Sequence, residues 1–143
     1  MIRQIVKRFS FLLGLALLIP LLSGCSKIIE TSLNSQFTLA PGESARIDSV
    51  PMTIKFIGET QDSRCPTMVQ CFWPGQVSCD IEITKDGNKN RVTLSDSLGS
   101  GLTTGYSFQN YKISFSVSPY PEAKRPIAKR DYRLSLMVSE IPY

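Results

Sequence analysis

This 143-residue chain contains four cysteines and no histidine. The cysteines are therefore the first side chains to consider for chemistry. Without histidine, neither a Ser-His-Asp nor a Cys-His nucleophilic relay can be built, and zinc or haem sites that need an imidazole ligand are excluded. Paired carboxylates offer no substitute, since Asp80 and Glu82 lie on the outward face of a predicted strand that encloses no substrate. The composition therefore predicts a non-catalytic protein, and it indicates no cofactor.

Cys25 follows a segment that is typical of a secretory signal. Residues 1–8 carry three basic side chains and no acid, and the apolar run 11–22 contains Pro20. This run is shorter than the roughly 20 residues that span a bilayer, although a single-pass anchor remains the alternative. Residues 22–25 (Leu-Ser-Gly-Cys) resemble the bacterial lipobox, which implies that Cys25 is lipidated and becomes the first mature residue. Such an anchor would hold the chain stably on a membrane.

The same resemblance implies a location in the bacterial cell envelope. Ser26, in place of Asp, follows the cysteine, which implies the periplasmic face of the outer membrane in a Gram-negative host. In a Gram-positive host it implies the outer face of the plasma membrane. Removal of residues 1–24 takes away three of the 16 basic residues and none of the 12 acidic ones, so a mature chain would be nearly neutral. A nucleic-acid partner is therefore not expected. The expected partner is an envelope protein or the cell wall. The oligomeric state is not predicted.

Alternating apolar and polar residues dominate the mature part of the chain and predict short β-strands. Asp86-Gly87 between two of them is typical of a tight hairpin, and the composition of residues 96–105 is typical of a flexible loop. We expect an antiparallel, immunoglobulin-like β-sandwich over residues 36–143, with a small β-barrel as the alternative. Residues 25–35 are expected to form a lipidated tether. The predicted strands cover residues 36–39, 44–48, 52–56, 76–84, 91–94, 111–117 and 132–138.

Three cysteines remain beside Cys25, and export would place them in an oxidising compartment. Cys79 occupies an inward position of the most regular predicted strand, where it can act as a small buried apolar side chain. Cys65 and Cys71 lie in a proline-bounded connection between two strands. Three pairings are open, and position favours Cys65–Cys71, whose small loop would contribute about 2 kcal/mol. A Cu(I) site made of three thiolates is the alternative, but a core-facing ligand cannot easily meet two ligands on a loop.

The cysteine loop also carries a resemblance to known proteins. The segments 62–66 (Asp-Ser-Arg-Cys-Pro) and 69–71 (Val-Gln-Cys), followed by Trp73 and Gly75, resemble the "DSRCP…VQC.W.G" signature of small bacterial secreted proteins and lipoproteins. The resemblance extends over most of residues 54–138, and the chain departs from the pattern at Phe72, Pro74 and Cys79. It implies an envelope location and a shared fold, and it implies no substrate.

Phe72 and Trp73 beside a constrained loop are candidates for a partner-binding surface, because aromatic side chains are common in interface hot spots. The competing interpretation, which is slightly favoured, places Trp73 over the end of the sandwich as a plug of the core. If the protein has a working surface, we expect it on the loop 62–75 and on the facing loop 96–106, with Tyr106 as a further candidate.

Two other segments indicate partners. Residues 103–106 (Thr-Thr-Gly-Tyr) resemble a loop of chagasin-type cysteine-protease inhibitors, which are also β-sandwiches, although the order of the motifs differs here. This resemblance implies a protease-inhibitor-like module as the alternative function. The basic residues Lys124, Arg125, Lys129 and Arg130 could contact anionic phospholipid or lipopolysaccharide. The favoured interpretation of these four is a solvated loop that keeps a sheet edge from pairing with other chains.

Overall fold

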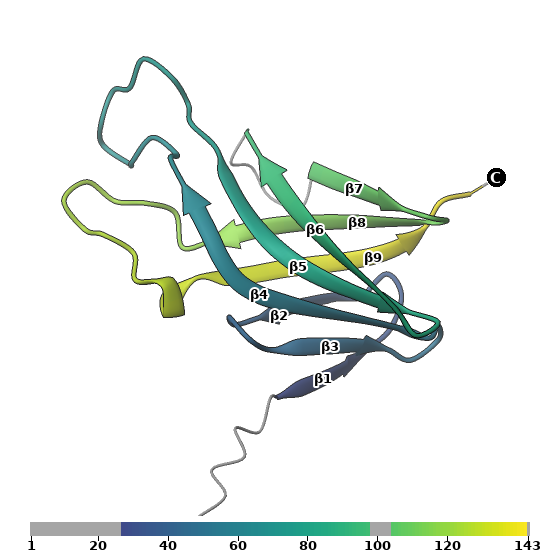
Figure 1. Cartoon of the computed structure of the whole chain (residues 1–143). Coiled ribbons are helices and arrows are strands. Elements are labelled where there is room, and N and C mark those ends of the chain that lie inside the picture. The colour runs from purple at the N-terminus through teal and green to yellow at the C-terminus, as the bar shows by residue number, and fades with distance from the viewer. Residues whose placement is uncertain (1–26, 98–103, 143) are drawn as a thin grey trace, which may run out of the picture.

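Two β-sheets pack face to face in this chain (Figure 1). The computed structural model describes residues 27–97 and 104–142, so the signal-like segment, Cys25 and most of the predicted loop 96–105 lie outside the described residues. Among the described residues, no helix is long and apolar enough to span a membrane. The strands are β1 (Ile28–Thr31), β2 (Gln36–Leu39), β3 (Ser44–Ile47), β4 (Met52–Asp62), β5 (Val77–Lys85), β6 (Asn88–Asp96), β7 (Thr104–Phe108), β8 (Tyr111–Ser118) and β9 (Arg133–Glu140), and a 3-10 helix covers Lys129–Asp131.

One sheet has the strand order β1-β3-β4-β5-β6 and the other has the order β2-β9-β8-β7. Neighbouring strands are antiparallel except β1 and β3, which are parallel. The predicted sandwich is therefore confirmed, and the described strands do not close into the alternative barrel, because each sheet keeps two edge strands. Strands β3 to β6 follow one another across their sheet, as do β7 to β9 across theirs. The immunoglobulin order instead places non-consecutive strands side by side.

The core forms where the inward side chains of the two sheets meet. Alternate side chains of β5 from Val77 to Ile83 are buried, as are alternate side chains from Tyr132 to Val138 at and along β9. Both sets are the predicted ones. Burial of a large aliphatic or aromatic side chain contributes about 1.5–3 kcal/mol, so this layer is the main source of stability. The largest fully buried side chains are Phe56, Phe115, Leu39, Ile47, Met52, Ile54, Ile81, Ile83, Leu94, Ile113, Leu134 and Leu136.

The connections sort to the two ends of the sandwich. Asp86 and Gly87 form the predicted tight turn between β5 and β6, with φ of 51° and 80°. The β4–β5, β6–β7 and β8–β9 connections all leave from the other end, because these strands alternate in direction. In Figure 1 this end carries the two long loops at the left of the view.

Strand β1 corrects the prediction that residues 25–35 are a tether. Ile28 to Thr31 pair in parallel with β3 from Ser44 to Ile47. The strand escapes detection in the sequence because it is only four residues long and its residues, Ile-Ile-Glu-Thr, do not alternate between apolar and polar. The folded domain therefore begins within three residues of Cys25.

Strands β4 and β7 also differ from the predictions. The alternation predicts that β4 ends at Phe56, but the strand continues to Asp62. Its register with β5 shifts between Phe56 and Thr60, around Gly58, whose φ is 92°. Such an irregularity interrupts the alternation on which the prediction rests. β7 was not predicted, because Gly and Thr near its start are typical of loops.

Cys79 lies in the core of β5 as a free thiol and is 1% exposed. Burial, together with the negative charge of Asp80, raises the pKa of this thiol to about 12. The thiolate is the reactive form of cysteine, so the folded protein holds Cys79 in its unreactive state at neutral pH.

We therefore expect iodoacetamide at about pH 8.5 to leave Cys79 unmodified in the folded protein and to modify it fully in denaturant, because unfolding returns the thiol to its ordinary pKa. Mass spectrometry of the peptide that contains Cys79 gives the result. Cys65 and Cys71, which are joined to each other, should stay unmodified in both states without reductant. Equal rates of modification of Cys79 in the two states would contradict its burial.

Candidate functional site

The connection between β4 and β5, residues 63–76, is called the stapled loop below. A disulfide joins Cys65 to Cys71, with the two Cα atoms 5.9 Å apart, so the predicted pairing is confirmed. With these two sulfurs bonded to each other and Cys79 buried in the core, a site made of three thiolates is not formed. These three cysteines therefore have structural roles, and the loop is a candidate site because of the surface that it presents.

The base of the stapled loop extends the β4–β5 hairpin by two further steps. The backbone N–H of Ser63 donates to the carbonyl oxygen of Gln76 at 2.8 Å, and the N–H of Cys65 donates to that of Pro74 at 2.9 Å. Gly75 fits between these strands only because it lacks a side chain: a Cβ there would lie 1.9 Å from the carbonyl oxygen of Ser63, and its φ is 71°. The disulfide and this close approach together make the loop narrow and rigid.

Arg64 ties the stapled loop to the opposite sheet. Its side chain is 3% exposed and bonds the Asp62 carboxylate through Nε at 2.9 Å and through Nη2. The same guanidinium donates from Nη1 to the carbonyl oxygen of Val117 at 2.8 Å and from Nη2 to that of Pro119 at 2.9 Å. Its Cζ lies 4.8 Å from the centre of the Tyr120 ring. A single buried cation thus joins the end of β4 to the end of β8.

The carboxylate of Asp62 is held in its charged form by this arrangement. Burial disfavours the charge, but the hydrogen bonds and positive charge of Arg64 outweigh burial and keep the pKa of Asp62 below its usual value. Tyr132 adds a hydrogen bond from its hydroxyl to Oδ2 of Asp62 at 3.3 Å. Burial, followed by the charge of Asp62 and this bond, raises the pKa of the Tyr132 hydroxyl. Both shifts are consistent with an ion pair that the surrounding hydrogen bonds keep charged.

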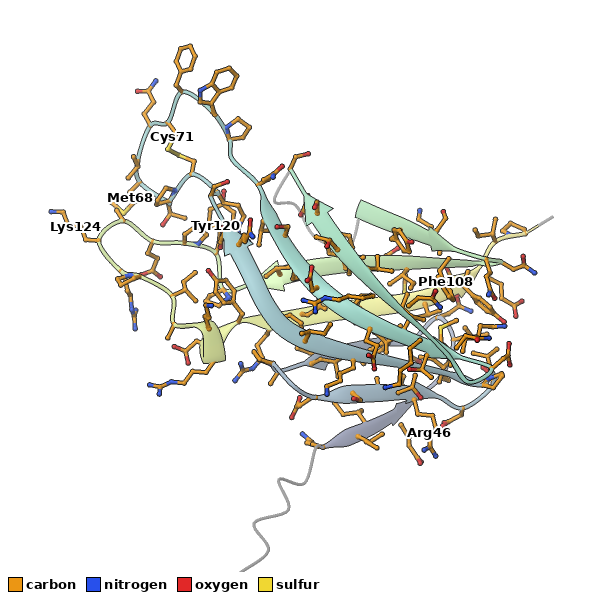
Figure 2. The ribbon with its side chains drawn as sticks, viewed as in Figure 1. Arg46, Met68, Cys71, Phe108, Tyr120 and Lys124 are labelled. Atoms are coloured by element: carbon orange, nitrogen blue, oxygen red, sulfur yellow. A yellow bond between two sulfur atoms is a disulfide. The ribbon has the colours of Figure 1, made fainter. Side chains whose placement is uncertain are left out.

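The far end of the stapled loop carries four exposed apolar side chains, which together are called the tip. Met68 is fully exposed, Phe72 is 90% exposed, Trp73 is 73% exposed and Val69 is 46% exposed. The rings of Phe72 and Trp73 contact each other edge to face, with centroids 5.1 Å apart (Figure 2). The favoured expectation that Trp73 plugs the core is therefore wrong. The Cys65–Cys71 bridge and the bonded base hold the end of the hairpin away from the sheets, so Trp73 has no core to cover.

The connection between β8 and β9, residues 119–132, packs beside the stapled loop and is called the basic loop. The N–H of Thr67 donates to the carbonyl oxygen of Pro121 at 3.0 Å, and Thr67 forms a β-bridge with Glu122. The basic side chains at 124, 125, 129 and 130 are all exposed. The loop is therefore solvated, as the favoured interpretation holds, but it does not protect a sheet edge, because β8 and β9 are the two inner strands of their sheet.

Tyr106 is not brought together with Phe72 and Trp73. It lies in β7, pairs in register with Ile113 and packs half-buried against the core. The residues that resemble the inhibitor loop, from Thr104 to Tyr106, thus form part of a strand. The ends of β6 and β7 do place their connection at the same end of the sandwich as the stapled loop, although residues 98–103 lie outside the described residues.

Sequence reasoning missed Arg64 and Asp62 as the frame of the site. The two residues are separated by one residue in a polar stretch, and an exposed loop is the ordinary interpretation of such a stretch. Only the carbonyl groups contributed by β8 and the residue after it reveal why Arg64 is buried. The Asp-x-Arg spacing itself is the one signal that was available.

We expect Asp62→Asn to lower the free energy of unfolding by about 3–5 kcal/mol at pH 7, because it leaves the Arg64 charge buried without its partner. Since the pKa of Asp62 is lowered on folding, its stabilising effect is present above the unfolded pKa near 3.9 and is lost as the pH falls through the folded value. The difference between variant and wild type should therefore shrink below about pH 4. Urea unfolding across this pH range provides the measurement.

The matched control is Glu82→Gln, which removes the partly exposed partner of Lys89 and should change stability by less than about 1 kcal/mol. Equal stability of Asp62→Asn and wild type at pH 7 would show that the ion pair does not hold the loop in place.

Comparisons with known proteins leave the function to be argued from this geometry. No protein-family model, no curated protein and no solved structure matches this chain.

Proposed function

We propose that this protein is a cell-envelope lipoprotein that works by binding through the tip of its stapled loop and carries out no catalysis. The observation that carries this proposal is the exposure of Met68, Val69, Phe72 and Trp73 on a loop that the rest of the structure holds rigid. Five of the seven large apolar side chains exposed among the described residues lie in the stapled and basic loops, the fifth being Tyr120. Grouped apolar exposure of this kind marks interaction surfaces.

The rigid frame supports binding more than a purely structural role. A loop that serves only to connect β4 and β5 needs neither a disulfide nor a buried ion pair, since long surface connections cost little stability. Here both devices fix the direction of one uncharged hairpin end, from Cys65 to Gln76. Preorganised loops bind with less loss of conformational entropy. Aromatic residues and methionine are also the side chains enriched at the centres of interfaces.

The lipid anchor rests on the sequence at residues 22–25 and on the position of the fold. β1 begins at Ile28, so an anchor on Cys25 would hold the sandwich close to a membrane. Even a fully extended chain covers only about 3.5 Å per residue.

The anchor is tested by Cys25→Ala expressed in a bacterial host with the lipoprotein pathway. We expect the wild-type chain to carry a diacylglycerol adduct by intact-mass spectrometry and to sediment with membranes, and the variant to lack both properties, because its side chain has no sulfur to acylate. Ser26→Ala is the matched control and should keep the adduct. A wild-type chain without the adduct would contradict the lipoprotein assignment.

Binding through the tip is tested by a photoreactive benzoylphenylalanine at position 72 in intact cells. We expect it to form adducts with an envelope component, because Phe72 is 90% exposed on the proposed contact surface. The control places the same group at Asn88, which is exposed at the opposite end of the sandwich. Equal adduct patterns from positions 72 and 88, or none from either, would contradict a binding role for the tip.

A further inference from the structure

We propose that the tip and the basic loop together form a docking surface for an anionic phospholipid bilayer. In this arrangement Met68, Phe72 and Trp73 enter the interfacial region, and Lys124 and Lys129 face the headgroups. The inference rests on the proposed function, since it names the partner of the same surface.

The apolar half of the surface is suited to a bilayer interface. Residues that enter the interface must leave water without bringing charge into the membrane. The segment from Cys65 to Gln76 contains no charged side chain, and its base is closed by backbone hydrogen bonds between Cys65 and Pro74 and between Ser63 and Gln76. Trp73 carries the type of side chain that is enriched at the membrane–water boundary. A narrow, convex and uncharged hairpin end therefore fits the interface.

The charged half lies directly beside the apolar half. Thr67 and Pro121 join the two loops by a backbone hydrogen bond, and Figure 2 shows Met68 and Lys124 at the same end of the molecule. The basic loop carries four basic residues against Glu122 and Asp131, a net charge of +2. Both carboxylates already have arginine neighbours, at 3.7 Å and 3.8 Å. Within the described residues, Lys124 and Lys129 have no carboxylate within ion-pair distance, so their charge is available to anionic headgroups.

The path of the chain favours a bilayer over a protein pocket as the occupant. A lipidated Cys25 would lie two residues before Lys27, so a membrane surface would be present within about 10 Å of the domain at all times. Tethering of this kind gives the second contact a high effective concentration. β1 also runs parallel to β3 and antiparallel to β4, and it begins level with Ser44 and Lys55, seven residues before the end of β4 at Asp62. A bilayer is therefore the surface that a domain anchored at Cys25 meets most often, and the tip reaches it when the strands incline along the membrane.

The fixed geometry of the two loops makes them act as one surface. Arg64 bonds the carbonyl oxygens of Val117 and Pro119, where β8 leads into the basic loop, while it holds Asp62 at the end of β4. In one orientation of the domain, the tip can therefore insert into the membrane interface while the lysines of the basic loop contact the headgroups. Each basic side chain near an anionic surface shifts binding roughly fivefold.

The chain has one tryptophan, so the emission of Trp73 reports on the tip alone. The experiment reconstitutes the full lipidated protein into phosphatidylethanolamine–phosphatidylglycerol vesicles and, separately, into phosphatidylcholine vesicles. A fraction of each lipid is brominated on its acyl chains as a quencher. The lipid anchor is retained in both membranes, so any difference in emission belongs to the tip. We expect a blue shift and quenching of Trp73 in the anionic vesicles, both reduced by high salt.

The decisive variant is Lys124→Glu with Lys129→Glu, which should reduce the docked-to-free ratio roughly fivefold or more for each reversed charge. The matched control is Lys89→Glu with Lys112→Glu, which reverses two exposed lysines at the opposite end and should leave quenching unchanged.

Each other outcome has a defined meaning. Equal quenching in both membranes, or equal loss in the two charge variants, would overturn recognition of anionic lipid. Stable incorporation without any change in Trp73 emission would overturn docking of the tip while leaving the lipoprotein assignment intact. In that case an adduct between position 72 and an envelope protein would identify a protein pocket as the occupant. Failure of the wild-type chain to incorporate at all would instead contradict the proposed function.

Discussion

The ion pair between Asp62 and Arg64 is the contact on which the position of the stapled loop depends. Asp62 ends β4 in one sheet, and Arg64 reaches the carbonyl oxygens of Val117 and Pro119 at the end of β8 in the other. A buried pair of this kind adds little net stability, because desolvation opposes the attraction, but removal of either partner leaves an unpaired buried charge. Its contribution is therefore geometric. It couples two long loops that are also joined further out by the backbone hydrogen bond from Thr67 to Pro121.

The repeating parts of the fold could be predicted from the sequence because they depend on local alternation. β5 shows every second residue buried from Val77 to Ile83, and its turn at Asp86-Gly87 needs positive φ at both positions. β1 and the extension of β4 could not be predicted in this way. β1 is defined by its parallel pairing with β3, and β4 passes through a register shift at Gly58. Both depend on contacts with a neighbouring strand, which a local pattern does not contain.

Of the candidate site, only the disulfide could be predicted from the sequence. The pairing of Cys65 with Cys71 follows from their place in one connection and from the inward position of Cys79. The exposure of Trp73 does not follow from its type, since a large aromatic residue near a sheet end is equally suited to the core. Its outward direction is set by the hairpin bonds below it and by Gly75, whose place beside Ser63 tolerates no side chain. Long-range geometry thus decides whether the tip is core or surface.

Anchoring at Cys25 and docking of the tip would together determine how the sandwich lies on a membrane. β1 begins level with Ser44 and Lys55, seven residues before the end of β4 at Asp62. At about 3.3 Å per residue this places the start of β1 roughly 23 Å behind the base of the stapled loop along the strand direction. A tether from Cys25 to Lys27 is too short to span that distance if the strands stand upright on the bilayer. Both contacts can reach one surface only when the strands lie inclined along it, which would turn the β5–β6 hairpin and the β7–β8 turn away from the anchored end.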